Sequence, residues 1–185
     1  MQSSPILCIA IDDETQLRLH ESRYAEEYFA LIERNRDHIR EWQAWAAHES
    51  SLEDIRIYMR NMLMQFANKG VLQTGIWHQG RLVGAIGYPR LDWEDSKVEI
   101  GYWIDAAMQG KGIVTKACRT LVTYAFEQYR LNKVEIHCAI GNTRSRAIPE
   151  RLRFTQEGSI RQAEWLNGRY VDLVIYGMLA SEWKG

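Results

Sequence analysis

Apolar residues recur along the chain at two spacings, and the change from one to the other predicts the order of strands and helices. Two short apolar runs, at residues 6–11 and 16–20, favour strands. From Tyr24 to Ile32 the apolar residues recur at helical spacing. The chain is therefore expected to open with two strands and a helix.

A second helix has a clear beginning and end. Ser51 and Asp54 have the spacing of a capping box, in which each side chain accepts a hydrogen bond from the other residue's backbone. The helix should end before Gly70. Between these limits one apolar stripe contains Leu52, Ile55, Met59, Met62, Leu63 and Phe66.

The middle of the chain predicts a strand, a turn and a long helix in direct succession. A hairpin is expected before this unit, with strands at residues 71–77 and 81–88, and a polar loop at 92–97 follows the hairpin. Residues 98–104 alternate between apolar and other side chains, as strands do. This strand runs into Met108-Gln109-Gly110-Lys111-Gly112, after which a helical face contains Val114, Ala117, Cys118, Leu121, Val122, Ala125 and Tyr129.

The last third of the chain predicts a strand at residues 134–140 and a short helix at 145–152. Because a helix tolerates proline without loss only in its first turn, Pro149 suggests a helix that starts late or bends. Asn167-Gly168 is typical of a type I′ turn and predicts a closing hairpin.

These elements favour one α/β domain over residues 1–185, with a mixed sheet and helices on both faces. The chain has 185 residues, of which 46% are hydrophobic, enough for one sizeable core. It contains no repeat and no linker rich in proline or glycine.

Composition narrows the function classes. No window approaches the ~18 to 20 apolar residues of a membrane span, and residues 1–5 lack the basic start of a secretory signal, so we expect a cytoplasmic protein without membrane association. Cys8, Cys118 and Cys138 share no metal-type spacing and lie in apolar segments. They are interpreted as small buried side chains, which argues against disulfide frameworks and zinc ribbons.

Charge is distributed unevenly. The formal net charge of −1 argues against a nucleic-acid-binding domain. Residues 1–70 have a balance of −4, whereas residues 109–153 have a balance of +6. Either one end attracts cations and the other anions, or both are ordinary solvated surfaces.

The glycine-bearing turn at residues 109–115 is a candidate anion site. Between a strand and a helix, such a turn exposes backbone N–H groups at a helix N-terminus, where the peptide dipoles favour phosphate. The turn has neither the P-loop pattern nor the dinucleotide-binding fingerprint. A helix cap without a ligand is the alternative.

The surrounding motifs add a family resemblance. Gln109-x-x-Gly112, preceded by Glu99-Ile-Gly-Tyr-Trp-Ile-Asp105 and followed by Asn142-x-x-Ser145, resembles the GCN5-related N-acetyltransferases (GNAT). The resemblance is to their RimJ/RimL-type branch, which includes ribosomal-protein N-acetyltransferases. It implies a mostly antiparallel mixed sheet of about seven strands that splays near Tyr102, with acetyl-coenzyme A in the splay and no metal.

The resemblance also implies a set of cofactor-binding residues. The pantetheine arm would pair with the strand at Trp103, Ile104 and Asp105. Asn142 would position Ser145 or the cofactor. The pyrophosphate would lie on backbone N–H groups of the turn, which comprises Gln109, Gly110, Lys111, Gly112, Ile113, Val114 and Thr115.

Three positions depart from the family pattern. Val114 replaces a glycine or alanine, and its branched side chain could crowd the phosphate. Pro149 stands where many relatives have a tyrosine that protonates the leaving thiolate, so Ser145 is the candidate acid, as in the RimJ/RimL-type branch. Arg153 replaces a glycine, so the turn after the short helix is expected to be built differently.

Glu99 is the candidate base, because an amine attacks a thioester only when neutral. A peptide α-amine with a pKa of ~8 loses its proton more readily than a lysine near ~10.4, so a modest base suffices. Glu99 is the one acid within residues 98–104, and it matches the family's glutamate base. A solvent-facing carboxylate is the alternative. The backbone N–H of Trp103 would stabilise the developing oxyanion.

Other residues have weaker assignments. His137 shares a strand face with Glu135, and a structural or surface role is favoured over catalysis. Trp42, Trp45 and Trp93 would border the acceptor groove, or they belong to the core or an interface.

The resulting hypothesis is direct acetyl transfer from acetyl-coenzyme A to a primary amine, most specifically a protein N-terminus of ribosomal type. A polyamine or aminoglycoside-like acceptor is a second possibility, and a non-catalytic acyl-coenzyme A-binding module is a third. An ATP-binding protein is disfavoured, because the P-loop lysine is missing. The aromatic content favours a homo-oligomer.

Overall fold

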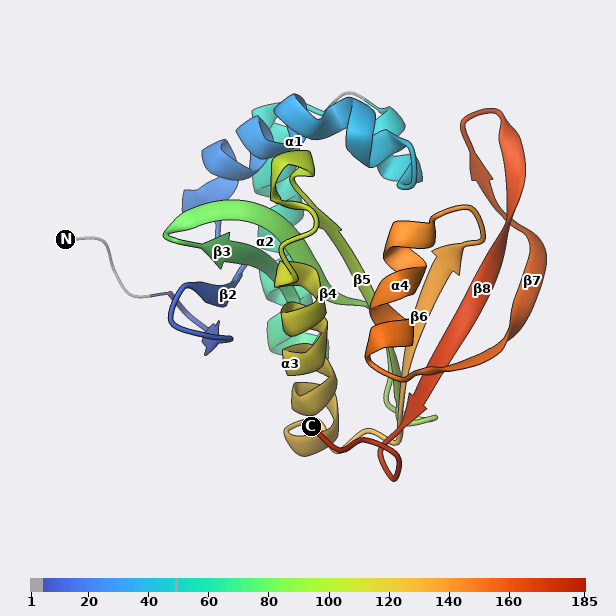
Figure 1. Cartoon of the computed structure of the whole chain (residues 1–185). Coiled ribbons are helices and arrows are strands. Elements are labelled where there is room, and N and C mark those ends of the chain that lie inside the picture. Colours follow the sequence, from blue (N-terminus) through green and yellow to red (C-terminus); the bar gives the residue numbers. More distant parts are fainter. Residues whose placement is uncertain (1–4, 49) are drawn as a thin grey trace.

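The computed structural model describes residues 5–48 and 50–185, and one eight-stranded sheet runs through them (Figure 1). The strand order is β1-β2-β3-β4-β5-β6-β8-β7. Residues 1–4, from which the absence of a secretory signal was largely inferred, lie outside the described residues. The strands are β1 (Cys8–Ala10), β2 (Thr15–Leu19), β3 (Gln73–His78), β4 (Arg81–Asp92), β5 (Lys97–Ile104), β6 (Lys133–Ala139), β7 (Thr155–Leu166) and β8 (Arg169–Leu179).

Helices cover both faces of the sheet, as the sequence predicts. The helices at residues 25–40 and 52–69 pack with β3 and β4 on one face, around Tyr28, Met59 and Trp77. The other face holds the larger core, around Leu121 and Ile136. The helices are α1 (Ala25–Arg40), α2 (Leu52–Lys69), α3 (Ile113–Glu127) and α4 (Thr143–Arg151), with short 3-10 turns η1 (Ser22–Tyr24), η2 (Ala44–Ala47) and η3 (Ala106–Met108).

The predicted limits of α2 are confirmed. The Asp54 backbone N–H donates to Ser51 Oγ at 3.2 Å, and the Ser51 backbone N–H donates to Asp54 Oδ2 at 2.8 Å. Gly70 ends the helix in the left-handed conformation, with φ +74°. Asn167 and Gly168 likewise have positive φ at the turn that joins β7 to β8.

The sheet splays between β5 and β6, where the resemblance places the splay (Figure 1). These two parallel strands pair only at Lys97–Lys133, Val98–Val134 and Glu99–Glu135 among their described residues. Beyond Glu99, β5 continues along β4, and β6 follows β8. The second half of β5 therefore has a free edge inside the molecule.

Helix α4 differs from the expectation for a proline-containing helix. It begins at Thr143, earlier than expected, and Pro149 lies in its interior. Proline has no backbone N–H, so the carbonyl of Ser145, four residues earlier, lacks its helical donor. The Tyr102 hydroxyl donates to that carbonyl at 3.0 Å. A side chain of β5 thus replaces the missing helical bond.

Arg153 adopts the conformation that glycine favours. Its φ is +62°, in the left-handed region. The turn after α4 is therefore left-handed although the residue is not glycine. The backbone N–H of Phe154 donates to the carbonyl of Pro149 at 2.9 Å and closes this turn.

The cysteines are not all buried, contrary to the sequence interpretation. Cys118 and Cys138 are buried, but Cys8 is exposed. The reason is position: β1 is a three-residue strand at the edge of the sheet, and Cys8 lies on its outer side.

Within residues 5–48 and 50–185, no helix is long and apolar enough to cross a membrane. The same residues contain no group of three or more histidine, cysteine, aspartate or glutamate side chains arranged to hold a metal ion.

Candidate active site

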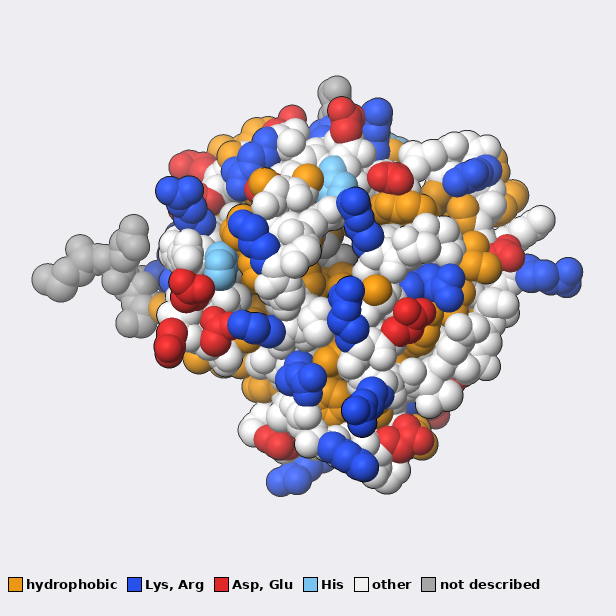
Figure 2. Space-filling model, viewed as in Figure 1, with side chains coloured by type: hydrophobic (Ala, Val, Ile, Leu, Met, Phe, Trp, Pro, Cys, Tyr) orange, Lys and Arg blue, Asp and Glu red, His pale blue; other side chains and the backbone are white. Residues whose placement is uncertain are grey.

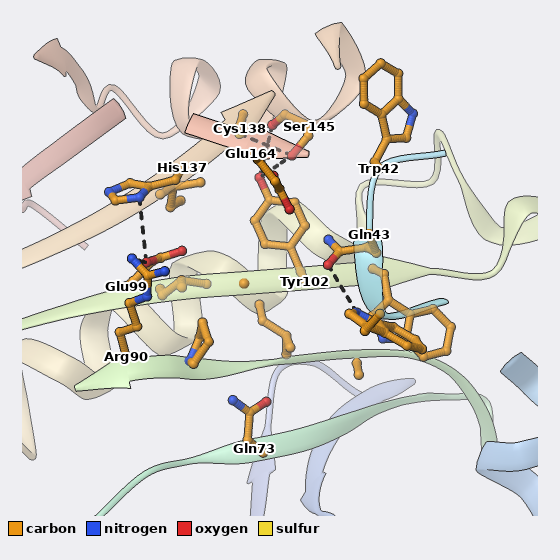
Figure 3. A pocket seen from close by; sticks show the side chains of 18 of the residues that line it. Trp42, Gln43, Gln73, Arg90, Glu99, Tyr102, His137, Cys138, Ser145 and Glu164 are labelled. Carbon is orange, nitrogen blue, oxygen red and sulfur yellow. Dashed lines mark hydrogen bonds and ion pairs between the residues drawn. The ribbon is translucent and has the colours of Figure 1, made fainter. Parts of the chain in front are cut away.

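A cavity of about 900 Å³ opens at the splay (Figure 3). Its walls come from the strands β3 to β8, from α1, α2 and the segment between them, and from the start of α4. The splay creates this space because backbone pairing between β5 and β6 stops at Glu99. Residues from both halves of the chain therefore face one another across it.

Glu99 lines the cavity, and its role as the base stays a prediction. Its side chain is 19% exposed, so it is not a solvent-facing carboxylate. Its Oε2 atom is buried and has no hydrogen-bond partner among the described residues. Two cationic or basic groups lie near: Arg90 Nη1 and His137 Nδ1, each 3.6 Å from Oε2.

His137 lies in the cavity wall beside Glu99, rather than on an outer surface. Its side chain is 15% exposed, and its Nε2 atom is 3.2 Å from Glu135 Oε2. The imidazole is therefore placed between two carboxylates, and Figure 3 shows its contact with Glu99. The alternation of β6 put His137 and Glu135 on one face, but it could not show that Glu99 faces them.

Glu164 on β7 is a second cavity carboxylate that the sequence analysis missed. Burial raises its pKa, the negative charge of Glu99 raises it further, and Arg90 opposes the shift. A carboxyl group with a raised pKa is suited to proton transfer near neutral pH. No local motif marks Glu164; it reaches the cavity because the β7–β8 hairpin folds back along β6.

Ser145 is held in place by the residue predicted to position it. Asn142 caps α4, and its Oδ1 accepts the Ser145 backbone N–H at 3.1 Å. Ser145 Oγ donates to the Tyr102 hydroxyl at 3.2 Å and lies 3.2 Å from Cys138 Sγ. Asn142 and Ser145 thus line the cavity together.

Tyr102 is a further site residue that sequence reasoning missed. Figure 3 shows it rising from β5 toward Ser145 and Cys138. Burial raises the pKa of its hydroxyl well above the ordinary value, so Tyr102 keeps its proton and acts as a hydrogen-bond donor. The missing N–H of Pro149 was the signal in the sequence, because it required some other donor for the Ser145 carbonyl.

The register of β5 decides which backbone groups face the splay. The Asp105 backbone N–H donates to the Val83 carbonyl of β4 at 2.7 Å. Hydrogen-bonded and open pairs alternate in antiparallel strands, so Trp103, paired with Ala85, also directs its N–H toward β4. The N–H groups of Tyr102 and Ile104 face the splay instead. The register therefore favours these two residues over Trp103 as donors to a ligand there.

The glycine turn has the geometry of an anion site. Gly110 and Gly112 have φ near +75°, and open space lies where their side chains would be. Gly112 is the N-cap of α3, and no side chain caps the helix. The first backbone N–H groups of α3, including that of Thr115, are thus available to a phosphate. Lys111 beside them is exposed.

Other turn residues are structural in this conformation. Val114 and Ile113 are buried in the larger core, so the side chain of Val114 packs beneath the turn. Gln109 bridges two helices: its Oε1 accepts from Arg144 at 2.7 Å, and its Nε2 lies 2.8 Å from His38 Nε2.

Asp105 also has a structural role. Its Oδ1 accepts the Ala107 N–H at the start of η3, and its Oδ2 pairs with Arg34 of α1. Burial tends to raise the pKa of Asp105, but these hydrogen bonds outweigh it and keep the pKa below the ordinary value.

Two of the three tryptophans considered for the acceptor groove line the cavity, and the third does not. Trp42 and Trp45 line the cavity. Trp93 lies elsewhere: its ring is 5.3 Å from that of Tyr129, and its Nε1 donates to the Lys69 carbonyl at 2.8 Å. Trp93 therefore closes the end of α2 and is not a groove residue.

Basic side chains spread over the face that carries α3 and α4 (Figure 2). They include Lys111, Lys116, Arg144 and Arg151 from the segment with a balance of +6. The glycine turn lies on this face, so its surroundings favour an anionic ligand.

Comparison with known proteins decides the family. The model of the acetyltransferase (GNAT) domain matches residues 15–155. The chain belongs to the GNAT acetyltransferase family. The divergence of β5 from β6, the glycine turn before α3 and the Asn142–Ser145 cap all lie inside the matched region, and the chain is accordingly an acetyltransferase.

Two relatives carry names that concern ribosomal proteins. The Bacillus subtilis "Putative ribosomal N-acetyltransferase YdaF" is 40% identical over 95% of this chain and 96% of its own length. The Escherichia coli "Ribosomal-protein-serine acetyltransferase" is 26% identical over 92% of this chain and 96% of its own length.

Two solved structures are similar over nearly the whole chain. A "Probable acetyltransferase" is 38% identical with a TM-score of 0.92, covering 96% of this chain and 99% of its own. The microcin C7 self-immunity acetyltransferase MccE, solved with acetyl-CoA and AMP, is 30% identical with a TM-score of 0.87, covering 91% and 94%.

Proposed function

We propose that this GNAT enzyme acetylates the N-terminal α-amine of a protein, with a ribosomal protein as acceptor. The observation that carries the proposal is the cavity at the splay, where Glu99, Glu164 and Ser145 meet from three separate elements. The names of two relatives, from Bacillus subtilis and Escherichia coli, support the ribosomal acceptor.

Acetyl-coenzyme A fits the residues present as the acetyl donor. The uncapped N-terminus of α3 would hold its pyrophosphate, with Gly110 and Gly112 leaving room above the turn. The N–H groups of Tyr102 and Ile104 would bind the extended arm and the thioester oxygen. When bound, the donor supplies the acetyl group as an activated thioester.

Glu99 and Ser145 would carry the two proton transfers. Glu99 removes a proton from the acceptor amine through a water molecule, and Ser145 Oγ donates to the sulfur as the C–S bond breaks. Glu164 is a second candidate base, favoured by its raised pKa. The two carboxylates together also attract a protonated amine into the cavity.

A small-molecule acceptor is the alternative proposal. It draws on MccE, whose structure contains AMP, and on Trp42 and Trp45, aromatic side chains that could stack on a planar group. A non-catalytic acyl-coenzyme A-binding module would share the cofactor site but not the proton transfers. The homo-oligomer expected from the sequence stays a prediction.

The test is acetyl-coenzyme A turnover, measured as release of free thiol, against N-terminal peptides of ribosomal proteins, lysine peptides, polyamines and aminoacyl nucleotides. We expect turnover with N-terminal peptides. Glu99→Gln, Glu164→Gln and Ser145→Ala should each be compared with Glu127→Gln, an exposed carboxylate on α3. Loss of about 100-fold or more in kcat is expected for the true base and acid, and none for the control.

The outcomes separate the candidates. Turnover with a nucleotide or polyamine but no peptide would assign the small-molecule function. Cofactor binding without turnover on any amine would leave the binding module. A large loss in Glu164→Gln with a small loss in Glu99→Gln would move the base from β5 to β7.

A further inference from the structure

A row of ionisable side chains leads away from the cavity along β6. It begins at Glu99, whose Oε2 is 3.6 Å from His137 Nδ1. His137 Nε2 is 3.2 Å from Glu135 Oε2, and Glu135 Oε1 is 2.9 Å from Lys133 Nζ. Lys133 also contacts Glu157 of β7 at 2.6 Å.

The proton balance of the reaction requires an outlet. An acceptor that enters as an ammonium ion loses two protons when it becomes an amide. One of them ends on the sulfur of the leaving thiol, where the C–S bond was broken, and Ser145 transfers it in the proposed mechanism. The other must reach bulk water in every turnover. With acceptor and cofactor bound in the cavity, a row of side chains in its wall would give this proton an outlet separate from the cavity mouth.

The surroundings of Glu99 restrict where that proton goes. Its Oε2 is buried and has no hydrogen bond among the described residues. Of the two side chains placed 3.6 Å away, the Arg90 guanidinium cannot take up a proton, because arginine stays charged in proteins. The imidazole of His137 can, because a neutral imidazole has one ring nitrogen that accepts a proton and one that donates.

We propose that His137 is a positioning residue that acts through Glu99, relaying its proton to Glu135 and to solvent. The inference rests on the proposed function, with Glu99 as the base. Nδ1 of the imidazole takes the proton from Glu99 as Nε2 gives its own to Glu135. Glu135 then releases its proton to water, and the ring regains its starting tautomer when Nδ1 gives a proton to water and Nε2 takes one from water.

Glu135 is suited to the receiving end of this relay. Burial tends to raise its pKa, but hydrogen bonds from Lys133 and His137 outweigh burial and keep the pKa below the ordinary value. Glu135 is therefore ionised at neutral pH and orients Nε2–H toward itself, leaving Nδ1 to face Glu99. At 21% exposure, its side chain reaches water.

The other charged groups around this row are few among the described residues. Arg90 of β4 pairs with Glu99. On β7, the charge of Glu99 raises the pKa of Glu164 and the charge of Arg90 lowers it. On β8, the residue opposite His137 is Ile175, which does not titrate. A change in the pH profile of kcat in a His137 variant therefore also includes the effects of Arg90 and Glu164 on Glu99.

The test compares His137→Gln and His137→Ala with the wild-type enzyme on the best peptide found above. We expect kcat to fall about tenfold or more near neutral pH, with the KM for acetyl-coenzyme A unchanged and the pH profile altered. Added imidazole should restore the rate of His137→Ala. 1-Methylimidazole, which has a basic nitrogen but no N–H, should not.

Glu135→Gln tests the second step, with Glu127→Gln as the matched control on an exposed surface. We expect Glu135→Gln to lower kcat in the same direction as His137→Gln, and the control to retain it. Circular dichroism and thermal unfolding would establish that each variant is folded. If His137→Ala turns over as the wild type does at all pH values, the relay is wrong.

The outcomes also separate this inference from the proposed function. A wild-type enzyme without turnover on any amine overturns the function itself. A wild-type enzyme that loses activity in Glu99→Gln but not in the His137 variants overturns only the relay. A loss in His137→Ala that imidazole and 1-methylimidazole restore equally would also overturn it, because passage through N–H would then be unnecessary.

Discussion

Single side chains explain where the sequence analysis succeeded and where it failed. Asn142 and Ser145 were placed correctly relative to each other, because a capping residue acts over three positions of the same segment. Glu164 and Tyr102 were missed, because their partners are far away in the sequence. Trp93 was left open between the groove and the core, and its ring packs against that of Tyr129. Local chemistry can be predicted from sequence, whereas contacts across the fold cannot.

His20 leads to a prediction at this scale about acid stability. It is buried against the rings of Tyr28 and Tyr58, and burial lowers its pKa from 6.5 to about 4. In the unfolded chain it takes up a proton near pH 6.5, whereas the folded chain resists until about pH 4. The free energy of unfolding should therefore fall as the pH drops through this window, by about 2 kcal/mol between pH 7 and 5.

The measurement is urea unfolding at pH 7, 6 and 5, for the wild type, His20→Phe and His48→Phe. His20→Phe should lack this part of the pH dependence, and His48→Phe, at an exposed position, should keep it. Equal pH dependence in all three proteins would contradict the assignment.

At the scale of elements, α2, the β7–β8 hairpin and the strand–turn–helix unit were predicted well, because caps, turn residues and periodicity are local signals. The start of α4 was not. The rule that proline belongs in a first turn assumes that no outside group satisfies the freed carbonyl, and Tyr102 does so. Arg153 shows a similar limit, since the turn was expected to be built differently without glycine, yet Arg153 itself adopts the left-handed conformation.

A prediction at this scale follows from the Tyr102 contact. Tyr102→Phe removes the hydroxyl and leaves the Ser145 carbonyl without this donor. We expect the free energy of unfolding to fall by about 1–3 kcal/mol, the usual effect of an unsatisfied buried group. Chemical unfolding measures it. The double variant Tyr102→Phe/Pro149→Ala restores a backbone N–H to α4 and should recover part of the loss; no recovery would show that Pro149 and Tyr102 are independent.

For the whole molecule, the family resemblance supplied the splayed sheet, and the structure adds that this sheet has eight strands. Its two parts are joined across β5 and β6 by three residue pairs. Hydrophobic patterns identified the strands but not this divergence, because divergence depends on which strands become neighbours.

A ligand bound between the two parts of the sheet is predicted to raise the stability of the chain. Acetyl-coenzyme A in the splay would contact both parts of the sheet and bind only the folded chain. The midpoint temperature of thermal unfolding should therefore rise with the concentration of acetyl-coenzyme A. At 100 times the dissociation constant, the free energy of unfolding should increase by about 2.7 kcal/mol. Substituting Gly112 by Ala, at φ +75°, should weaken the shift, whereas Gly80→Ala, at the β3–β4 turn, should not. A shift that Gly112→Ala leaves intact would argue against binding at the turn.

The free edge of β5 has one more consequence. An unpaired strand edge is normally a template on which other chains add strands and aggregate. Here the unpaired edge beyond Glu99 belongs to a strand in the middle of the sheet and faces the cavity. A strand that arrives as part of another sheet would meet β6 and β8 on the opposite wall, whereas a single extended chain needs less room. The fold thus leaves unpaired backbone N–H and C=O groups of β5 accessible to an extended ligand but not to the edge of another sheet.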